Sequence, residues 1–281
     1  MILQTVISIS SMIIQNCLFN NVCKNKLKTD SSIYRFNMII YAMCICLFGA
    51  IAIRGKISLY TVISGLIFGV VTALSNFYKM KALKSGPMHI TLLITTSSMI
   101  IPTISGVFFG EHFSGTKFVM VLLLIGFIYL SLDRGKNSKI NIGYLLFCLL
   151  AFVFQGSIGV LQKIHQNSPY KAETGSFLFF AFICSLIYSW IRSGKNTAHT
   201  KFTKGQIALA AICGICTYTM NFLNLKLSGL LPSQLFFPLV NGSAIVISSL
   251  LSVVIFKEKL SKKQFAGLLG GILSLIGICI V

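Results

Sequence analysis

Uncharged polar residues recur on one face of several long apolar stretches of this sequence. Near the N-terminus, Gln4, Ser8, Ser11 and Gln15 are spaced so that all four lie on one side of a helix. Inside a membrane, such side chains are costly unless they have partners or face a hydrated cavity. Amides and hydroxyls both donate and accept hydrogen bonds. The chemistry that this pattern offers is therefore recognition of a small polar solute.

Comparable polar faces recur along the chain, and together they give one set of candidate residues. The predicted substrate-binding residues are Gln4, Ser8, Gln15, Asn76, Tyr78, Thr91, Thr95, Ser98, Gln155, Gln162, Tyr218, Asn221, Gln234 and Asn241. For a lone serine or threonine, the favoured alternative is a hydrogen bond to its own helix backbone. For the amides, a bond to a neighbouring helix stays open as the alternative, since a buried amide must satisfy both a carbonyl and an NH2 group.

The acidic residues limit the chemistry, because all of them fall in predicted loops or at predicted helix ends. They are Asp30, Glu111, Asp133, Glu173 and Glu258. No membrane-centred carboxylate is then available to bind and release a proton or to pair with a cationic drug. We expect Glu111 and Glu258 to stabilise turns by accepting hydrogen bonds from helix N-terminal N–H groups.

Enzyme chemistry has little support in this sequence. It has no HExxH or GxSxG motif and no pair of carboxylates within an apolar stretch, and the Cys213-Gly214-Ile215-Cys216 spacing lacks the strand and helix context of a redox motif. We therefore predict no catalytic residue, no metal site and no cofactor. A sensor or scaffold that transports nothing stays open as an alternative. Lys79, Lys81 and Lys226 can meet an anionic or zwitterionic substrate, or extend to lipid headgroups instead.

The composition indicates an integral membrane protein. Apolar residues make up 55% of the chain and charged residues only 10%, and the mean hydropathy is +0.86. So little polar surface cannot coat a water-soluble globule of this size. The formal net charge is +19, but the basic residues stand singly or in small clusters between apolar runs. This distribution argues against nucleic acid as a partner and favours contact with anionic lipid headgroups.

Apolar runs long enough to cross a bilayer predict ten transmembrane helices. Their approximate ranges are 1–22, 33–53, 57–78, 87–109, 116–132, 140–162, 174–191, 205–225, 230–256 and 263–281. The fold class predicted is therefore all-α. Glycine pairs at Gly65/Gly69, Gly106/Gly110 and Gly267/Gly271 permit close helix contact. Such contacts can lie within one chain or join two protomers, so the protein is expected to be a monomer or a homodimer.

The sequence is internally duplicated. Phe109-Gly110-Glu111-His112-Phe113-Ser114 has a second version in Phe256-Lys257-Glu258-Lys259-Leu260-Ser261, and Asn76-Phe77 has one in Asn221-Phe222. We therefore predict two five-helix units, 1–135 and 136–281. An odd number of helices per unit inverts the second copy. The loops after the odd-numbered helices hold 18 Lys and Arg residues and the other loops hold 6, as inversion requires.

Each copy has an Asn/aromatic-rich third helix, a proline that opens the fourth helix and a Glu-containing turn before a Gly-rich fifth helix. With these features the two copies resemble the EamA-type members of the drug/metabolite transporter superfamily. The resemblance covers nearly the whole chain. It implies a carrier in the cell membrane, with ten helices in an inverted repeat around a central cavity that opens alternately to each side. Members carry small metabolites and are often exporters.

This resemblance and the amide-rich faces rank the expected substrates. An amino acid or other small zwitterion comes first, then a sugar or nucleoside, then an amphipathic drug, with multidrug efflux as the alternative function. The charge count places both termini outside the cell, whereas such proteins are commonly drawn with both termini in the cytoplasm. Orientation therefore stays open.

Overall fold

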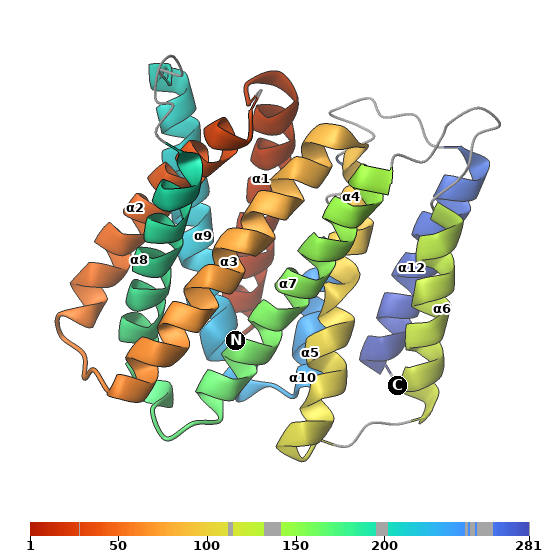
Figure 1. Cartoon of the computed structure of the whole chain (residues 1–281). Helices are drawn as coiled ribbons and strands as arrows, with labels where there is room; N and C mark the ends of the chain where they lie inside the picture. The colour runs from red at the N-terminus through yellow and green to blue at the C-terminus, as the bar shows by residue number, and fades with distance from the viewer. Residues whose placement is uncertain are drawn as a thin grey trace.

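The chain forms a bundle of long helices in the computed structural model (Figure 1). The structure describes residues 1–27, 29–111, 115–131, 142–194, 202–244, 247, 251 and 261–280. Within this part of the chain the regular elements are helices, and no strand occurs. This confirms the predicted all-α class for the described residues.

The first half of the described chain contains three long helices, a fourth that is broken into short segments, and a fifth. The elements are α1 (Ile2–Asn25), α2 (Asp30–Ala52), α3 (Leu59–Ser85), α4 (Met88–Thr96), η1 (Ser97–Met99), α5 (Ile100–Ser105), η2 (Gly106–Phe109) and α6 (Gly115–Ser131). Side chains set the start of two of them. Thr29 accepts a hydrogen bond from the Ser32 amide at the start of α2, and Ser58 accepts one from the Thr61 amide at the start of α3.

The second half follows the same order of long and broken helices. Its elements are α7 (Ile142–Gln166), η3 (Lys171–Glu173), α8 (Thr174–Ser193), α9 (Lys204–Leu230), α10 (Ser233–Phe237), the π-helical turn η4 (Pro238–Gly242) and α12 (Lys262–Ile280). Thr203 and Gln206 form a reciprocal capping box at the start of α9. The helix after Ser233 changes from α to π geometry at Pro238, which has no N–H to donate.

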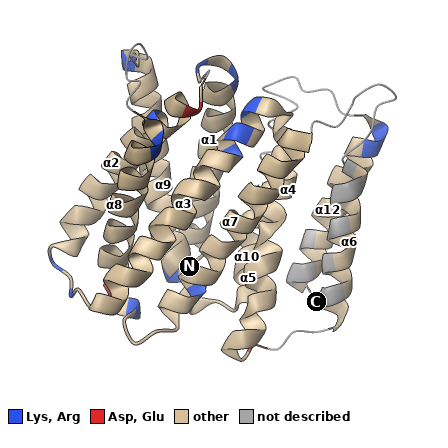
Figure 2. Cartoon of the chain, viewed as in Figure 1, with Lys and Arg blue, Asp and Glu red and all other residues tan. Residues whose placement is uncertain are grey.

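Seven helical segments of the described residues are long and apolar enough to cross a membrane. They are Ile2–Asn25, Asp30–Ala52, Leu59–Ser85, Ile90–Phe109, Ile142–Gln166, Lys171–Ser193 and Lys204–Leu230. Each coincides with one of the predicted stretches. α6 and α12 occupy two further predicted stretches, but they are shorter, at 17 and 19 residues. Figure 2 shows the lysines and arginines gathered at the two ends of the bundle, as membrane-crossing helices require.

The helices pack mostly in pairs that join the two halves. α2 packs on α8, α3 on both α7 and α8, α1 on α9, and α6 on α12. Aromatic side chains fill the centre of the larger core, where Phe36, Phe48, Phe68 and Phe182 are fully buried. This packing sets α1, α3, α7 and α9 around one central space.

Two glycines of α3 allow a close approach between α3 and α8. A Cβ atom at Gly65 would lie 2.7 Å from the carbonyl oxygen of Phe177, and one at Gly69 would overlap the carbonyl oxygen of Ala181. The Ser185 hydroxyl donates to the Gly69 carbonyl across the same contact, at 2.7 Å. The Gly65/Gly69 pair therefore packs two helices of one chain, the first of the two roles predicted for it.

Candidate functional site

A cavity lies at the centre of the bundle, between α1, α3, α7, α9 and the two broken helices. Its volume in this structure is about 50 Å³. Its lining residues are Met12, Thr72, Asn76, Ser98, Met99, Pro102, Gln155, Ile158, Gly159, Gln162, Thr217, Met220, Asn221, Asn224, Phe236, Phe237 and Asn241. We call this cavity the central pocket.

The central pocket brings together six of the predicted substrate-binding residues. They are Asn76, Ser98, Gln155, Gln162, Asn221 and Asn241. The pocket therefore receives residues from both halves of the sequence. Its polar groups are amides and hydroxyls, and none of its lining residues carries a charged side chain.

Single hydrogen bonds orient the amides that line the pocket. Asn76 donates to the Tyr41 hydroxyl at 3.1 Å, and Asn221 and Asn241 donate to the backbone carbonyls of the preceding helical turn, both at 2.9 Å. Gln155 accepts from the Ser75 hydroxyl, also at 2.9 Å. Among the described residues, the side-chain oxygens of the three asparagines accept no hydrogen bond and the Gln155 NH2 group donates none. These four amides therefore keep three acceptors and one NH2 group available to a ligand.

Other predicted residues support the lining from behind. Ser8 of α1 donates to the side-chain oxygen of Asn224, at 2.5 Å, and Gln15 donates to the Thr217 hydroxyl. Both acceptors are residues of the pocket wall on α9. Ser8 and Gln15 are thus buried between α1 and α9, and they fix the position of the wall without lining it.

The remaining predicted residues lie away from the central pocket. Gln4 is exposed near the start of α1, and Gln234 is buried in α10. Thr95 donates to the backbone carbonyl of Thr91 at 2.8 Å. This bond within its own helix is the alternative to substrate binding predicted for a lone threonine. Thr91 itself bonds the Pro87 carbonyl and the Tyr144 hydroxyl.

The two predicted tyrosines are held by aromatic neighbours. The Tyr78 ring stacks on Phe154, with ring centroids 5.9 Å apart, and the Tyr218 ring stacks on Phe222 at 6.0 Å. Neither tyrosine lines the pocket. Both rings instead pack between helices.

Several lining residues were missed by sequence reasoning. Asn224 follows Asn221 by three residues, so helical spacing could have found it. Thr72 lies one turn before Asn76, and its buried hydroxyl has no hydrogen-bond partner among the described residues. The apolar members, such as Met220 and Phe237, gave no signal, because an apolar residue in a membrane helix looks alike whether it faces lipid, protein or a cavity.

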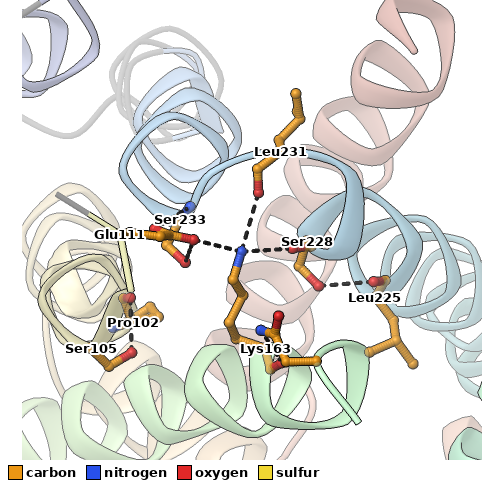
Figure 3. Close-up of polar contacts among 9 residues, drawn as sticks. Pro102, Ser105, Glu111, Lys163, Leu225, Ser228, Leu231 and Ser233 are labelled. Carbon is orange, nitrogen blue, oxygen red and sulfur yellow. Dashed lines mark hydrogen bonds and ion pairs between the residues drawn. The ribbon is translucent and has the colours of Figure 1, made fainter. Parts of the chain in front are cut away.

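A buried ion pair lies beyond the central pocket, toward the C-terminal end of α7. Lys163 and Glu111 approach to 2.8 Å, with only 8% and 17% of their side chains exposed. Glu111 also accepts from the backbone amide and hydroxyl of Ser233, at 2.9 and 3.1 Å, and Lys163 donates to the carbonyls of Ser228 and Leu231 (Figure 3). Ser233 opens α10, so Glu111 does bond a helix N-terminal N–H group, as predicted. Glu258 and Asp133 lie outside the described residues.

A second buried cation lies on α3, one turn beyond Asn76. Lys79 is 8% exposed and donates to the side-chain oxygen of Asn16 at 2.7 Å. The Lys79 side chain therefore does not extend to lipid headgroups, the alternative predicted for it, and it does not line the central pocket.

Comparison with known proteins agrees with this architecture. The EamA-like transporter family matches residues 141–281, half of the chain. The glucose uptake protein GlcU of Staphylococcus xylosus is 28% identical over 226 residues, which cover 76% of this chain and 75% of that protein. A crystal structure described only as that of a protein superposes with a TM-score of 0.68 at 15% identity, covering 96% of this chain and 95% of that one, and so shares the fold. These findings point to a transporter rather than an enzyme. The chain is a multi-pass transporter of the cell membrane and belongs to the EamA-like transporter family.

Proposed function

We propose that this transporter carries a small neutral polar solute, with a hexose as the first candidate, through the central pocket. The observation that carries the proposal is the lining, which offers amides and hydroxyls but no charged side chain. A free amino acid would bring an ammonium and a carboxylate group into this cavity, and a charge without a partner is costly there. A sugar has hydroxyls that donate and accept at once. In this proposal a sugar therefore comes ahead of the zwitterions ranked first from the sequence.

The polar groups of the pocket suit such a ligand. The side-chain oxygens of Asn76, Asn221 and Asn241 accept no bond from the described residues and can accept from sugar hydroxyls, and the Gln155 NH2 group can donate to a sugar oxygen. Phe236 and Phe237 add apolar surface for the carbon–hydrogen faces of the ring. The relative from Staphylococcus xylosus is named a glucose uptake protein, which favours a hexose and favours uptake over export.

Alternating access by two inverted five-helix units, 1–135 and 136–281, with ten crossings in all, is the mechanism that we propose. The packing supports it, because equivalent helices occupy equivalent places. α2 packs on its own counterpart α8 and α6 on its counterpart α12, while the pair α3 with α7 corresponds to α9 with α1. A two-fold axis in the membrane plane produces this exchange, and the central pocket lies between the two units.

Counterflow in proteoliposomes tests the substrate. Purified protein is reconstituted into vesicles loaded with unlabelled glucose or unlabelled alanine. The uptake of the same solute in labelled form is then followed against vesicles without protein. We expect saturable glucose counterflow and none of alanine. Alanine counterflow without glucose counterflow would refute the neutral-solute assignment, and flux of neither would favour a scaffold.

Two pocket variants and one control test the site. Asn221→Ala and Gln155→Ala each remove one ligand-facing group, so each is expected to raise the half-saturation concentration by roughly two- to tenfold, the effect of one hydrogen bond. Ser157→Ala on α7 is the matched control, because its hydroxyl bonds the Val153 carbonyl of its own helix and does not line the pocket. All three variants should insert normally. Unchanged kinetics in both amide variants would remove these residues from the site.

A further inference from the structure

A second cavity opens at the end of the bundle where α2 and α9 end and α8 begins. It has a volume of about 370 Å³, and Ile51, Gln166, Lys171, Phe222, Lys226 and Leu230 line it. We call it the basic groove. It lies at the lower end of the bundle in the view of Figure 2, where basic positions border the loops. The groove shares no lining residue with the central pocket.

The two lysines of the basic groove have no acidic partner among the described residues. The Lys226 ammonium lies 4.2 Å from the centre of the Phe222 ring, which holds it over the groove. Lys171, which also lines the groove, is exposed. Glu173 is close in sequence, but its carboxylate accepts from the backbone amide and the hydroxyl of Ser58, at 2.9 and 2.8 Å. The groove therefore presents positive charge that the described protein does not neutralise.

Further basic residues lie near the groove, although this end of the bundle has few Lys and Arg residues elsewhere. The loops at this end of the bundle hold only six of the Lys and Arg residues of the sequence. Lys171 and Lys226 are two of them, and Arg54 and Lys56 lie in the turn after α2. That turn is joined to the start of α8, since the Ser176 hydroxyl donates to the Lys56 carbonyl at 3.0 Å. Four of the six thus gather at one corner.

The walls of the groove have the character of a lipid contact at the membrane interface. Ile51 and Leu230 supply apolar surface, and Leu230 is 64% exposed. Tyr60 and Tyr170 stack at this end of the bundle, with ring centroids 5.3 Å apart, and tyrosines concentrate at the depth of lipid headgroups. An occupant of the groove would have its polar part beside the lysines and its apolar part along α2 and α9.

We propose that the basic groove binds the headgroup of an anionic phospholipid. The lipid phosphate lies between Lys171 and Lys226, and the acyl chains run along Ile51 and Leu230. Basic pockets between membrane helices are suited to anionic headgroups, whose charge they neutralise at the bilayer surface. The proposal is independent of the solute carried by the central pocket.

Lipid titration of the purified transporter tests this proposal. Protein in a neutral detergent is titrated with phosphatidylglycerol or phosphatidylcholine, and the retained lipid is counted by native mass spectrometry while the unfolding midpoint is recorded. We expect phosphatidylglycerol alone to be retained and to raise the midpoint. Each lysine near an anionic headgroup contributes roughly fivefold in affinity, so Lys171→Gln with Lys226→Gln should weaken phosphatidylglycerol binding about thirtyfold.

Two control proteins and a soluble ligand decide between the outcomes. Lys262→Gln removes one exposed lysine at the opposite end of the bundle and should leave lipid binding unchanged, as should the charge-keeping pair Lys171→Arg and Lys226→Arg. Equal retention of the two lipids, or unchanged binding in the double glutamine variant, would overturn the proposal. So would sn-glycerol 1-phosphate raising the midpoint at the same concentration, because the site would then bind a soluble phosphate.

Discussion

The ion pair between Glu111 and Lys163 gives a quantitative test of the structure. It joins the end of α7 to the turn after η2, where Glu111 also bonds the start of α10, and its side chains are 8% and 17% exposed. In Glu111→Gln, the Lys163 ammonium keeps the carbonyls of Ser228 and Leu231 but loses its counter-charge. In Lys163→Met, the carboxylate keeps the two bonds from Ser233 but loses its cation. Removing one partner of a buried pair leaves an uncompensated charge, which costs about 3 kcal/mol.

The double variant Glu111→Gln with Lys163→Met leaves no unpaired charge, so it should be more stable than either single variant. A well-packed neutral replacement of a buried pair is often close to neutral in stability. The three variants and the wild-type protein form a double-mutant cycle, from which we expect a coupling energy of about 3 kcal/mol or more.

Thermal unfolding in detergent measures this cycle. At roughly 2 °C per kcal/mol for a chain of this length, each single variant should lower the midpoint by about 6 °C. Asp30→Asn is the matched control, because it breaks the Lys81–Asp30 pair, whose side chains are 25% and 50% exposed. An exposed pair contributes less than about 1 kcal/mol. Single variants as stable as the control, or a double variant that loses the sum of both singles, would refute the reasoning.

Two further substitutions test the packing around the pocket. Gly69→Ala should destabilise the protein by about 1–3 kcal/mol, because the new methyl group would overlap the carbonyl oxygen of Ala181. Gly126→Ala on α6 is the control and should not destabilise it, because a Cβ there meets nothing within 4 Å. Equal unfolding midpoints for the two variants would contradict the close contact of α3 and α8. Lys79→Met should leave the unfolding midpoint unchanged or raise it, because the ammonium makes one hydrogen bond, to Asn16, and no ion pair among the described residues. A fall of the midpoint by more than about 3 °C, roughly 1.5 kcal/mol, would show that the cation stabilises the fold.

Hydropathy predicted where helices lie better than where they end. The third predicted stretch stops at residue 78, whereas α3 continues to Ser85. The residues in between include Lys79, Lys81 and Lys84, and their charge lowers the hydropathy. Backbone hydrogen bonds that extend a helix do not depend on apolar side chains. Lys79 bonds Asn16 and Lys81 pairs with Asp30, so the charged turns are stabilised by contacts that a sequence does not reveal.

Helical spacing predicted which polar residues share a face but not which neighbour that face meets. Gln15 and Asn221 both belong to polar faces, yet Asn221 lines the central pocket while Gln15 bonds Thr217 behind the wall. The difference depends on the rotation of α1 against α9, which is set by packing. Lys163 was missed for a related reason, because nothing in the sequence joins it to Glu111, 52 residues earlier.

The predicted duplication accounts for what the two halves share and for the neutral lining of the central pocket. Asn76 and Asn221 are equivalent in the predicted duplication, and both line the pocket, as a two-fold axis through the cavity would require. Three residues later the copies differ, with Lys79 in one and Asn224 in the other. Asn224 lines the pocket, whereas the Lys79 side chain bonds Asn16 of α1. Lys79, the cation at the position equivalent to Asn224, therefore does not line the pocket. An uncharged solute then meets only amides and hydroxyls, because the charge at the equivalent position is held by another helix.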